Sequence, residues 1–142
     1  MGFFVTKVQS ENWTRVFSEY AHLATFGVQR NRELERIDFS LLALDDKNSP
    51  AGFITCKEMD AETLYWQYGG VFPNYQKSLH VIEGYREFLS WSRQRYKRVT
   101  TRIENENITM LKMALMVGFR IMGVHLFDKK IFVELNIEFQ GG

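Results

Sequence analysis

Asn107-Ile-Thr-Met-Leu-Lys-Met-Ala-Leu-Met-Val-Gly118-Phe119 predicts a complete helix that leads into a strand. Asparagine is favoured at helix N-caps, because its side-chain oxygen accepts a backbone N–H of the first turn, and Asn105 or Asn107 fits that position. Gly118 permits the left-handed backbone with which many helices end. Phe119 then starts a strand and fills the core. The segment therefore predicts a capped helix, a glycine exit and a sharp corner.

Seven strands are predicted around this corner. Each is a run rich in β-branched and aromatic residues, which favour strands. They are Phe3–Val8, Phe39–Leu44, Ala51–Lys57, Thr63–Val71, Val99–Ile103, Phe119–Phe127 and Ile131–Phe139. Polar turns join the second strand to the third and the third to the fourth, so these strands are expected to form antiparallel hairpins.

Three further helices are predicted from apolar residues at helical spacing or from charged runs. One begins after Ser10 and ends near Gly27, one covers Gln29–Arg36, and one covers about Ser78–Tyr96. The element order is β-α-α-β-β-β-α-β-α-β-β. Strand-helix-strand crossovers near 71–99 and 103–119 imply some parallel pairing. We expect one α/β domain over residues 1–140, with a mixed sheet and helices on both faces.

Composition excludes several classes of protein. The chain has 142 residues and a formal net charge of +1, so no overall field draws it to nucleic acid or to an anionic membrane. A single cysteine, Cys56, leaves no internal disulfide and no cysteine cluster for zinc, and the three histidines lack metal-ligand spacing. No apolar run is long enough to span a bilayer. We therefore expect a cytoplasmic protein without a metal.

The element order and Asn107–Phe119 resemble the GNAT superfamily of acyl-CoA N-acyltransferases, of which the chain would be a divergent member. A second stretch, Val71–Val81, is similar to the family's V-x-P-x-Y lead into a phosphate-binding loop. The resemblance implies a GNAT-like fold with acetyl-CoA as co-substrate and no metal. It also implies a sheet that opens between the strands ending at Val71 and Glu104. The acceptor would then enter from the opposite side, near Gly27–Arg36 and the final hairpin.

The resemblance also implies which residues hold the coenzyme. In the family, the end of the central strand pairs with the pantetheine arm, and loop amides at the next helix start hold the pyrophosphate. By position these residues are Val71, Phe72, Gln76, Lys77, Ser78, Leu79, His80, Val81 and Asn107. Leu79 and Val81 replace glycines, whose missing Cβ lets backbone approach a phosphate. Lys77 offers direct charge pairing instead.

Catalytic groups are less well marked. Many family members carry a tyrosine seven positions after the asparagine, where it protonates the leaving thiolate, but this chain has Ala114 there. Glu104 follows a strand at the carboxyl edge of the sheet and is a candidate general base. Tyr68 is a second candidate on the central strand. Glu104 and its neighbour Glu106 fit equally well as acids that favour a helix N-terminus.

The function expected from these observations is transfer of an acetyl group from acetyl-CoA to a small-molecule or protein amine by direct attack. The alternative is a non-catalytic GNAT-like structural or interaction protein, similar to some components of phage virions. A basic helix end at Arg93–Arg98 offers a nucleic-acid contact, which we consider the least favoured of the three. An exposed last strand would also allow a homodimer.

Overall fold

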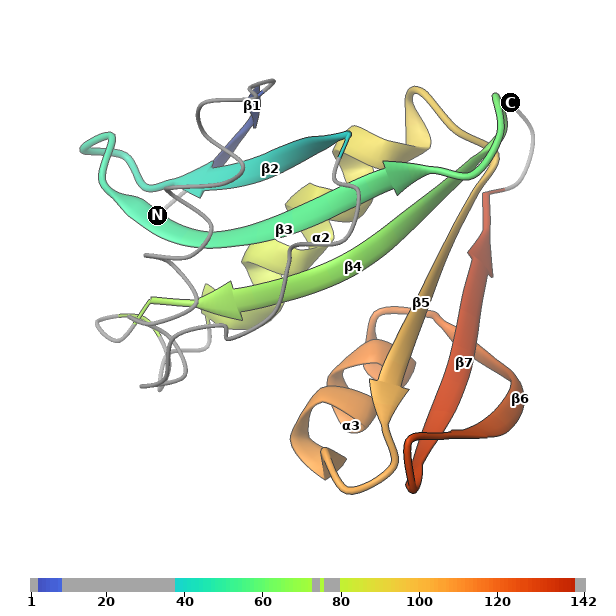
Figure 1. The fold of residues 1–142 in the computed structure, drawn as a ribbon. Coiled ribbons are helices and arrows are strands. Elements are labelled where there is room, and N and C mark those ends of the chain that lie inside the picture. The colour runs from blue at the N-terminus through green and yellow to red at the C-terminus, as the bar shows by residue number, and fades with distance from the viewer. Residues whose placement is uncertain (1–2, 9–37, 73–74, 76–79, 140–142) are drawn as a thin grey trace.

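The fold is given by a computed structural model that describes residues 3–8, 38–72, 75 and 80–139. Figure 1 shows its elements: β1 (Phe4–Val8), β2 (Phe39–Leu44), β3 (Pro50–Glu58), β4 (Thr63–Val71), α2 (His80–Arg93), β5 (Arg98–Glu104), α3 (Ile108–Met116), β6 (Arg120–Phe127) and β7 (Lys130–Glu138). Every predicted strand is confirmed, with ends that differ by at most one residue. The helices expected between Ser10 and Arg36 lie outside the described residues.

Helix α2 ends earlier than the apolar spacing predicts. The N–H groups of Arg95 and Tyr96 both donate to the carbonyl of Ser92, at 3.0 and 2.8 Å, and so close a turn. The Tyr96 hydroxyl then donates to Glu58 Oε1 at 2.8 Å. Tyr96 therefore leaves the helix to bond to the end of β3, which is a contact that helical periodicity does not report.

The corner between α3 and β6 forms as the sequence predicts. Asn107 is the N-cap, since its Oδ1 accepts the N–H of Met110 at 3.2 Å. Gly118 has a φ of +113°, and a Cβ there would lie 3.2 Å from Ile137 Cδ1. Phe119 is buried, and its ring centroid lies 5.6 Å from that of Trp66. The corner therefore delivers an aromatic anchor to the centre of the core.

Both described helices pack on the same face of the sheet, which we call the inner face. Tyr85 and Phe88 of α2 share one buried cluster with Ala114 of α3 and Trp66 of β4. Trp66 is the hub of this cluster, because its ring lies 6.5 Å from Tyr85 and 6.4 Å from Phe88. Side chains alternate along a strand, so Tyr65 points to the opposite, outer face.

The sheet order is β1-β2-β3-β4-β5-β7-β6. The early hairpins are antiparallel and β4 pairs parallel with β5, as predicted. Among the described strands, the prediction of some parallel pairing is confirmed by this pair alone, because the crossover near 103–119 leads to β6, which does not lie next to β5. Asp128 and Lys129 both have positive φ, as in the two-residue turns whose twist matches the right-handed twist of the strands they join. The hairpin folds back so that β7 lies between β5 and β6.

The line along which β4 and β5 adjoin, here called the seam, is paired at one end only. Its closed end runs from Thr63↔Arg98 to Trp66↔Thr101. Just after Trp66, β4 carries a bulge. Thr55 and Cys56 are consecutive in β3, but they pair with Tyr68 and Trp66, so Gln67 is an extra residue of β4 at this point. Bulges bend a strand and increase its twist. Figure 1 shows β4 and β5 starting together and separating along their length. The opening predicted between these strands is present.

Candidate active site

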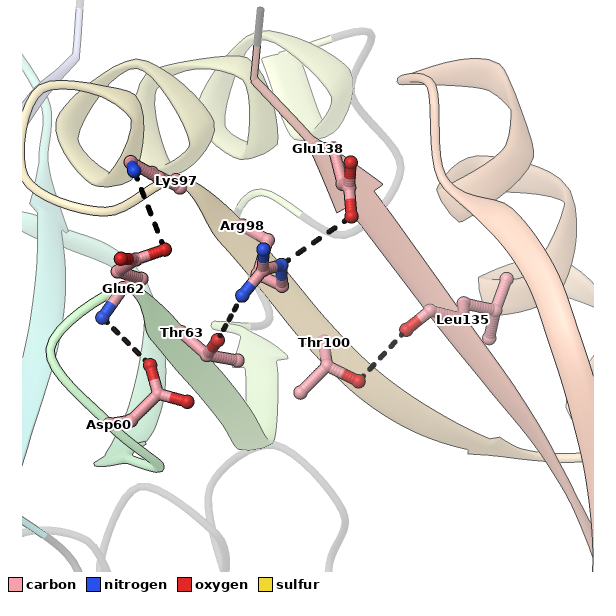
Figure 2. A network of polar contacts seen from close by, with 8 residues as sticks. All are labelled: Asp60, Glu62, Thr63, Lys97, Arg98, Thr100, Leu135 and Glu138. Carbon is pink, nitrogen blue, oxygen red and sulfur yellow. Dashed lines mark hydrogen bonds and ion pairs between the residues drawn. The ribbon is translucent and has the colours of Figure 1, made fainter. Parts of the chain in front are cut away.

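The closed end of the seam is held by polar contacts, shown in Figure 2. Arg98 donates through Nη1 to Thr63 Oγ1 at 3.0 Å, and its Nε lies 3.5 Å from Glu138 Oε1. Lys97 Nζ lies 3.5 Å from Glu62 Oε2. These side chains connect the turn before β4 with the start of β5 and the end of β7. They lie at the end of the seam from which the two strands diverge.

The open end of the seam borders a cleft of about 210 Å³ on the inner face. β4 and β5 form its floor, and α2 and α3 form its sides. Most of the lining is apolar and includes Ile54, Trp66, Met110, Met113, Ala114 and Phe119. Thr101 Oγ1 donates to the Trp66 carbonyl at 3.0 Å and links β5 to β4 where the strands part. The cleft is therefore a narrow apolar slot that begins where strand pairing stops.

Tyr85 brings a polar group into this slot. Its hydroxyl lies 3.9 Å from Met110 Sδ, across the cleft on α3. The same hydroxyl would lie 3.6 Å from a Cβ built at Gly69, so it faces the backbone of β4 beyond the bulge. Burial raises the pKa of Tyr85 to about 12. Helical spacing predicts that Tyr85 is buried, but it does not show that the hydroxyl reaches a cleft.

Of the residues implied for the coenzyme, Asn107 lines the cleft. Val71 and Val81 line a second hollow of about 20 Å³, between the end of β4 and the start of α2. The ring centroid of Phe72 lies 6.0 Å from that of Phe53, and its N–H donates to the carbonyl of Ala51 at 2.9 Å. Gln76, Lys77, Ser78, Leu79 and the His80 side chain lie outside the described residues. The structure therefore leaves the phosphate loop a prediction.

The stretch before that loop is tied to the β2–β3 turn. The Tyr75 hydroxyl donates to Asp45 Oδ2. Asp45 Oδ1 accepts the N–H groups of Lys47 and Ser49, at 2.8 and 2.9 Å. These hydrogen bonds, that from Tyr75 first, lower the pKa of Asp45. The carboxylate thus holds the turn and the Tyr75 ring together close to the expected coenzyme loop.

Of the two candidate catalytic residues, Glu104 does not line the cleft. Glu104 is the last residue of β5, and its Oε2 lies 4.0 Å from Lys130 Nζ. Glu104 is the register partner of Phe132 in β7, and both side chains lie on the outer face. Tyr68 pairs with Thr55, but its side chain lies outside what the structure describes. Glu106 is exposed next to the start of α3. A role for Glu104 would therefore be exerted from the outer face.

A second pocket, of about 540 Å³, opens on the outer face. Its walls include Tyr65 from β4 and Phe127, Lys130 and Phe132 from the final hairpin. Gln67 and Arg102 line both this pocket and the inner cleft. The two cavities therefore lie on opposite faces of the sheet near the same residues of β4 and β5.

His125 lines the outer pocket and was not singled out by the sequence. Its Nδ1 lies 3.2 Å from Glu134 Oε1, close enough for an ion pair when protonated, although the direction is not that of a hydrogen bond. Arg102 Nε lies 3.3 Å from the same oxygen. The His125 ring stacks on Phe132 with centroids 5.7 Å apart. The register of β6 on β7 assembles this group, and sequence spacing does not reveal it.

Among the residues that the structure describes, no group of three or more His, Cys, Asp or Glu side chains could hold a metal ion. Within the same residues, no helix has the length and apolar character needed to cross a membrane.

No model of a known protein family matches the sequence, and no curated protein matches it. Solved structures do resemble the fold. An IAA acetyltransferase from Bacillus cereus is 11% identical with a TM-score of 0.73, and the match covers 97% of this chain and 100% of that one. A spermidine/spermine N-acetyltransferase from Vibrio cholerae, solved with manganese ions, is 10% identical with a TM-score of 0.72, over 96% and 92% of the two chains.

A GNAT family acetyltransferase from Elizabethkingia anophelis, solved with acetyl-CoA bound, is 12% identical with a TM-score of 0.65, over 97% of this chain and 99% of that one. The chain has the GNAT fold. The prediction made from the element order and the corner at Gly118 is confirmed, and the likeness extends over nearly the whole chain. At these identities it establishes the GNAT architecture, while the chemistry must be argued from the side chains.

Proposed function

We propose that this protein is an acyl-CoA-dependent N-acyltransferase that transfers an acetyl group from acetyl-CoA to an amine by direct attack. The open end of the seam carries the proposal. Past Trp66, no described strand pairs with β4 on the side of β5, and an apolar cleft lies beside that edge. An extended chain with amide groups adds readily to such an edge as an extra strand. The pantetheine arm of coenzyme A is a chain of this kind.

The lining of the inner cleft suits the reacting end of acetyl-CoA. Met110, Met113 and Ala114 present apolar surface to a thioester, which has little to gain from water. The pyrophosphate would lie at the start of α2, where helix N–H groups favour anions. Gln76–Val81 would hold it there, as the resemblance implies. A structural neighbour from Elizabethkingia anophelis is solved with acetyl-CoA bound, which supports acetyl-CoA as the co-substrate.

The amine would approach through the outer pocket and reach the thioester where Gln67 and Arg102 line both cavities. Its nitrogen attacks the carbonyl carbon, the carbon–sulfur bond breaks, and the nitrogen releases a proton. Glu104 and His125 both lie on the outer face and are candidate acceptors of that proton. A carboxylate and an imidazole can each accept a proton from an attacking amine. Measuring the rate for Glu104→Gln and His125→Gln separately distinguishes them.

Thermal melting with acetyl-CoA tests the proposal most directly. A ligand present at about 100 times its dissociation constant stabilises the folded state by about 2.7 kcal/mol. Ala114→Phe should abolish this stabilisation, because the added ring fills the cleft. Ala61→Phe adds the same ring to an exposed turn and should leave the stabilisation intact. No change in melting temperature at millimolar acetyl-CoA would instead support a non-catalytic scaffold with the GNAT fold.

The acceptor is then found by following release of coenzyme A with a panel of amines. The Vibrio cholerae neighbour, named for spermidine and spermine, makes polyamines one arm of the panel. Free amino acids and short peptides with an unblocked N-terminus form the other arms. We expect release above the rate in water with at least one arm. Release that never exceeds the rate in water would contradict transfer to an amine.

A further inference from the structure

The inner cleft contains a hydroxyl whose position fits a departing sulfur. Tyr85 Oη faces the β4 backbone at Gly69 on one side and Met110 Sδ on the other. Its side chain is 93% buried, since 7% of its surface is exposed. A thioether is a weak acceptor, and 3.9 Å is a long contact for it. The hydroxyl therefore gives up little when a better acceptor enters the cleft.

Other donors in the described lining are less suitable for proton transfer. Thr101 Oγ1 already donates to the Trp66 carbonyl at 3.0 Å. The Asn107 side chain holds the first turn of α3 through its oxygen, and an amide N–H is a far weaker acid than a phenol. Ala114 offers no polar atom at the position where the GNAT resemblance leads one to expect tyrosine. Tyr85 reaches the same cleft from α2 instead of α3.

We propose that Tyr85 is the general acid of the transfer and protonates the thiolate of coenzyme A as it leaves. The inference rests on the proposed function. As the amine nitrogen bonds to the carbonyl carbon, the carbon–sulfur bond breaks and its electron pair goes to sulfur. The sulfur takes the proton of Tyr85 Oη. The proton released by the amine passes to the base on the outer face and to water, and water returns one to the phenolate. The products are the amide and free coenzyme A.

The surroundings of Tyr85 suit this role. Trp66 and Phe88 pack against its ring at centroid distances of 6.5 and 5.9 Å, which fixes the direction of the hydroxyl. Desolvation raises the pKa of Tyr85 to about 12, so the group is protonated at neutral pH. The same apolar surroundings disfavour a thiolate and raise the pKa of the departing thiol. The pKa of the donor, Tyr85, and the pKa of the acceptor, the departing thiol, are therefore both raised.

Tyr85→Phe removes the hydroxyl and keeps the packed ring, so it tests the proposal without opening a cavity. General acids contribute about 100-fold to 10,000-fold to rate. We expect kcat for coenzyme A release to fall by about 100-fold, with either the best amine or water as nucleophile. The KM for acetyl-CoA and the stabilisation by acetyl-CoA should not change. Tyr96→Phe removes a hydroxyl that bonds to Glu58 outside the cleft and should leave kcat unchanged.

The outcomes separate this inference from the proposed function. If the wild-type protein binds acetyl-CoA and releases coenzyme A while Tyr85→Phe retains the full kcat, Tyr85 is not the acid and the acyltransferase assignment stands. A variant that loses affinity for acetyl-CoA in proportion to its rate would show that the hydroxyl serves binding instead. If the wild-type protein neither binds nor cleaves acetyl-CoA, both proposals are wrong.

Discussion

The two ends of the β4–β5 seam differ in every respect that matters for function. At the closed end the strands pair from Thr63 to Trp66, and charged side chains bridge across the outside. At the open end pairing stops, and a cleft of about 210 Å³ takes its place. One end is closed by backbone hydrogen bonds, whereas the other presents a strand edge, apolar walls and the buried phenol of Tyr85. The closed end therefore sets the geometry that the open end uses.

Buried packing and surface charge contribute unequally to this arrangement. Trp66 is 5% exposed and contacts the aromatic rings of Phe88 in α2 and of Phe119, just before β6. By contrast, the side chains of Lys97 and Glu62 are 69% and 50% exposed, so water screens their attraction. The difference teaches that the divergence of the strands depends mainly on the core beneath the seam. The ion pairs above it refine the geometry at little energetic gain.

Trp66→Ala should have the largest effect on this comparison. Removing a buried tryptophan typically costs about 3–5 kcal/mol, because apolar burial is lost and a cavity remains. Trp66 lies at the point where pairing ends, so both ends of the seam lose their common support. Urea unfolding measures the change in free energy. Met122→Ala, at an exposed site on β6, should change it by less than about 0.5 kcal/mol. Equal losses for the two variants would contradict the central role of Trp66.

Thr101→Val should have an intermediate effect. The change removes the hydrogen bond to the Trp66 carbonyl and should destabilise the fold by about 1 kcal/mol. Thr100→Val is the matched control, because it removes the bond from Thr100 Oγ1 to the Leu135 carbonyl, between β5 and β7. Both variants should unfold at slightly lower urea. We expect the affinity for acetyl-CoA to fall for Thr101→Val alone, and an equal fall for both would show that the seam is not special.

Arg98→Ala should have an effect on stability no larger than that of Thr101→Val. Arg98 is 34% exposed and its partner Glu138 is 69% exposed, so the pair contributes about 0.5 kcal/mol in low salt and less in high salt. The bond to Thr63 adds a comparable amount. Melting at two salt concentrations measures both parts. A loss above about 2 kcal/mol would mean that the closed end depends on its charges and not on the core beneath it.

The acid range offers a check on the turn that precedes the expected coenzyme loop. The pKa of Asp45 is lower in the folded protein than in the unfolded chain, so its stabilising contribution is present above about pH 4 and is lost as the pH falls through the folded-state pKa. Asp45→Asn should therefore flatten the fall in melting temperature below that pH. An unchanged acid profile would show that other carboxylates dominate it.

Local sequence determined the helices and strands and the corner between α3 and β6 on which the family resemblance rests. Asn107 caps a helix because its side chain reaches the first turn, and Gly118 ends it because glycine tolerates positive φ. The strands follow their β-branched and aromatic runs to within one residue. For the site, the family resemblance indicated an opening between β4 and β5, which the structure shows, and Asn107 lines the cleft beside it. The cap, the glycine exit and the strands depend on residues close together in the sequence. The opening between β4 and β5 was expected from the family resemblance, which itself rests on motifs within single elements.

Tertiary structure decided which strands are neighbours in the sheet and which side chains from different elements come together. It inserted β7 between β5 and β6, it brought His125 to Glu134 through the hairpin register, and it aimed the Tyr85 hydroxyl into the cleft. Each of these depends on contacts between residues far apart in the chain. Spacing within one helix or strand fixes which face a side chain occupies, but the partner on that face comes from another element. The sequence by itself therefore determined the fold of this protein, and packing between its elements determined which groups its candidate active site contains.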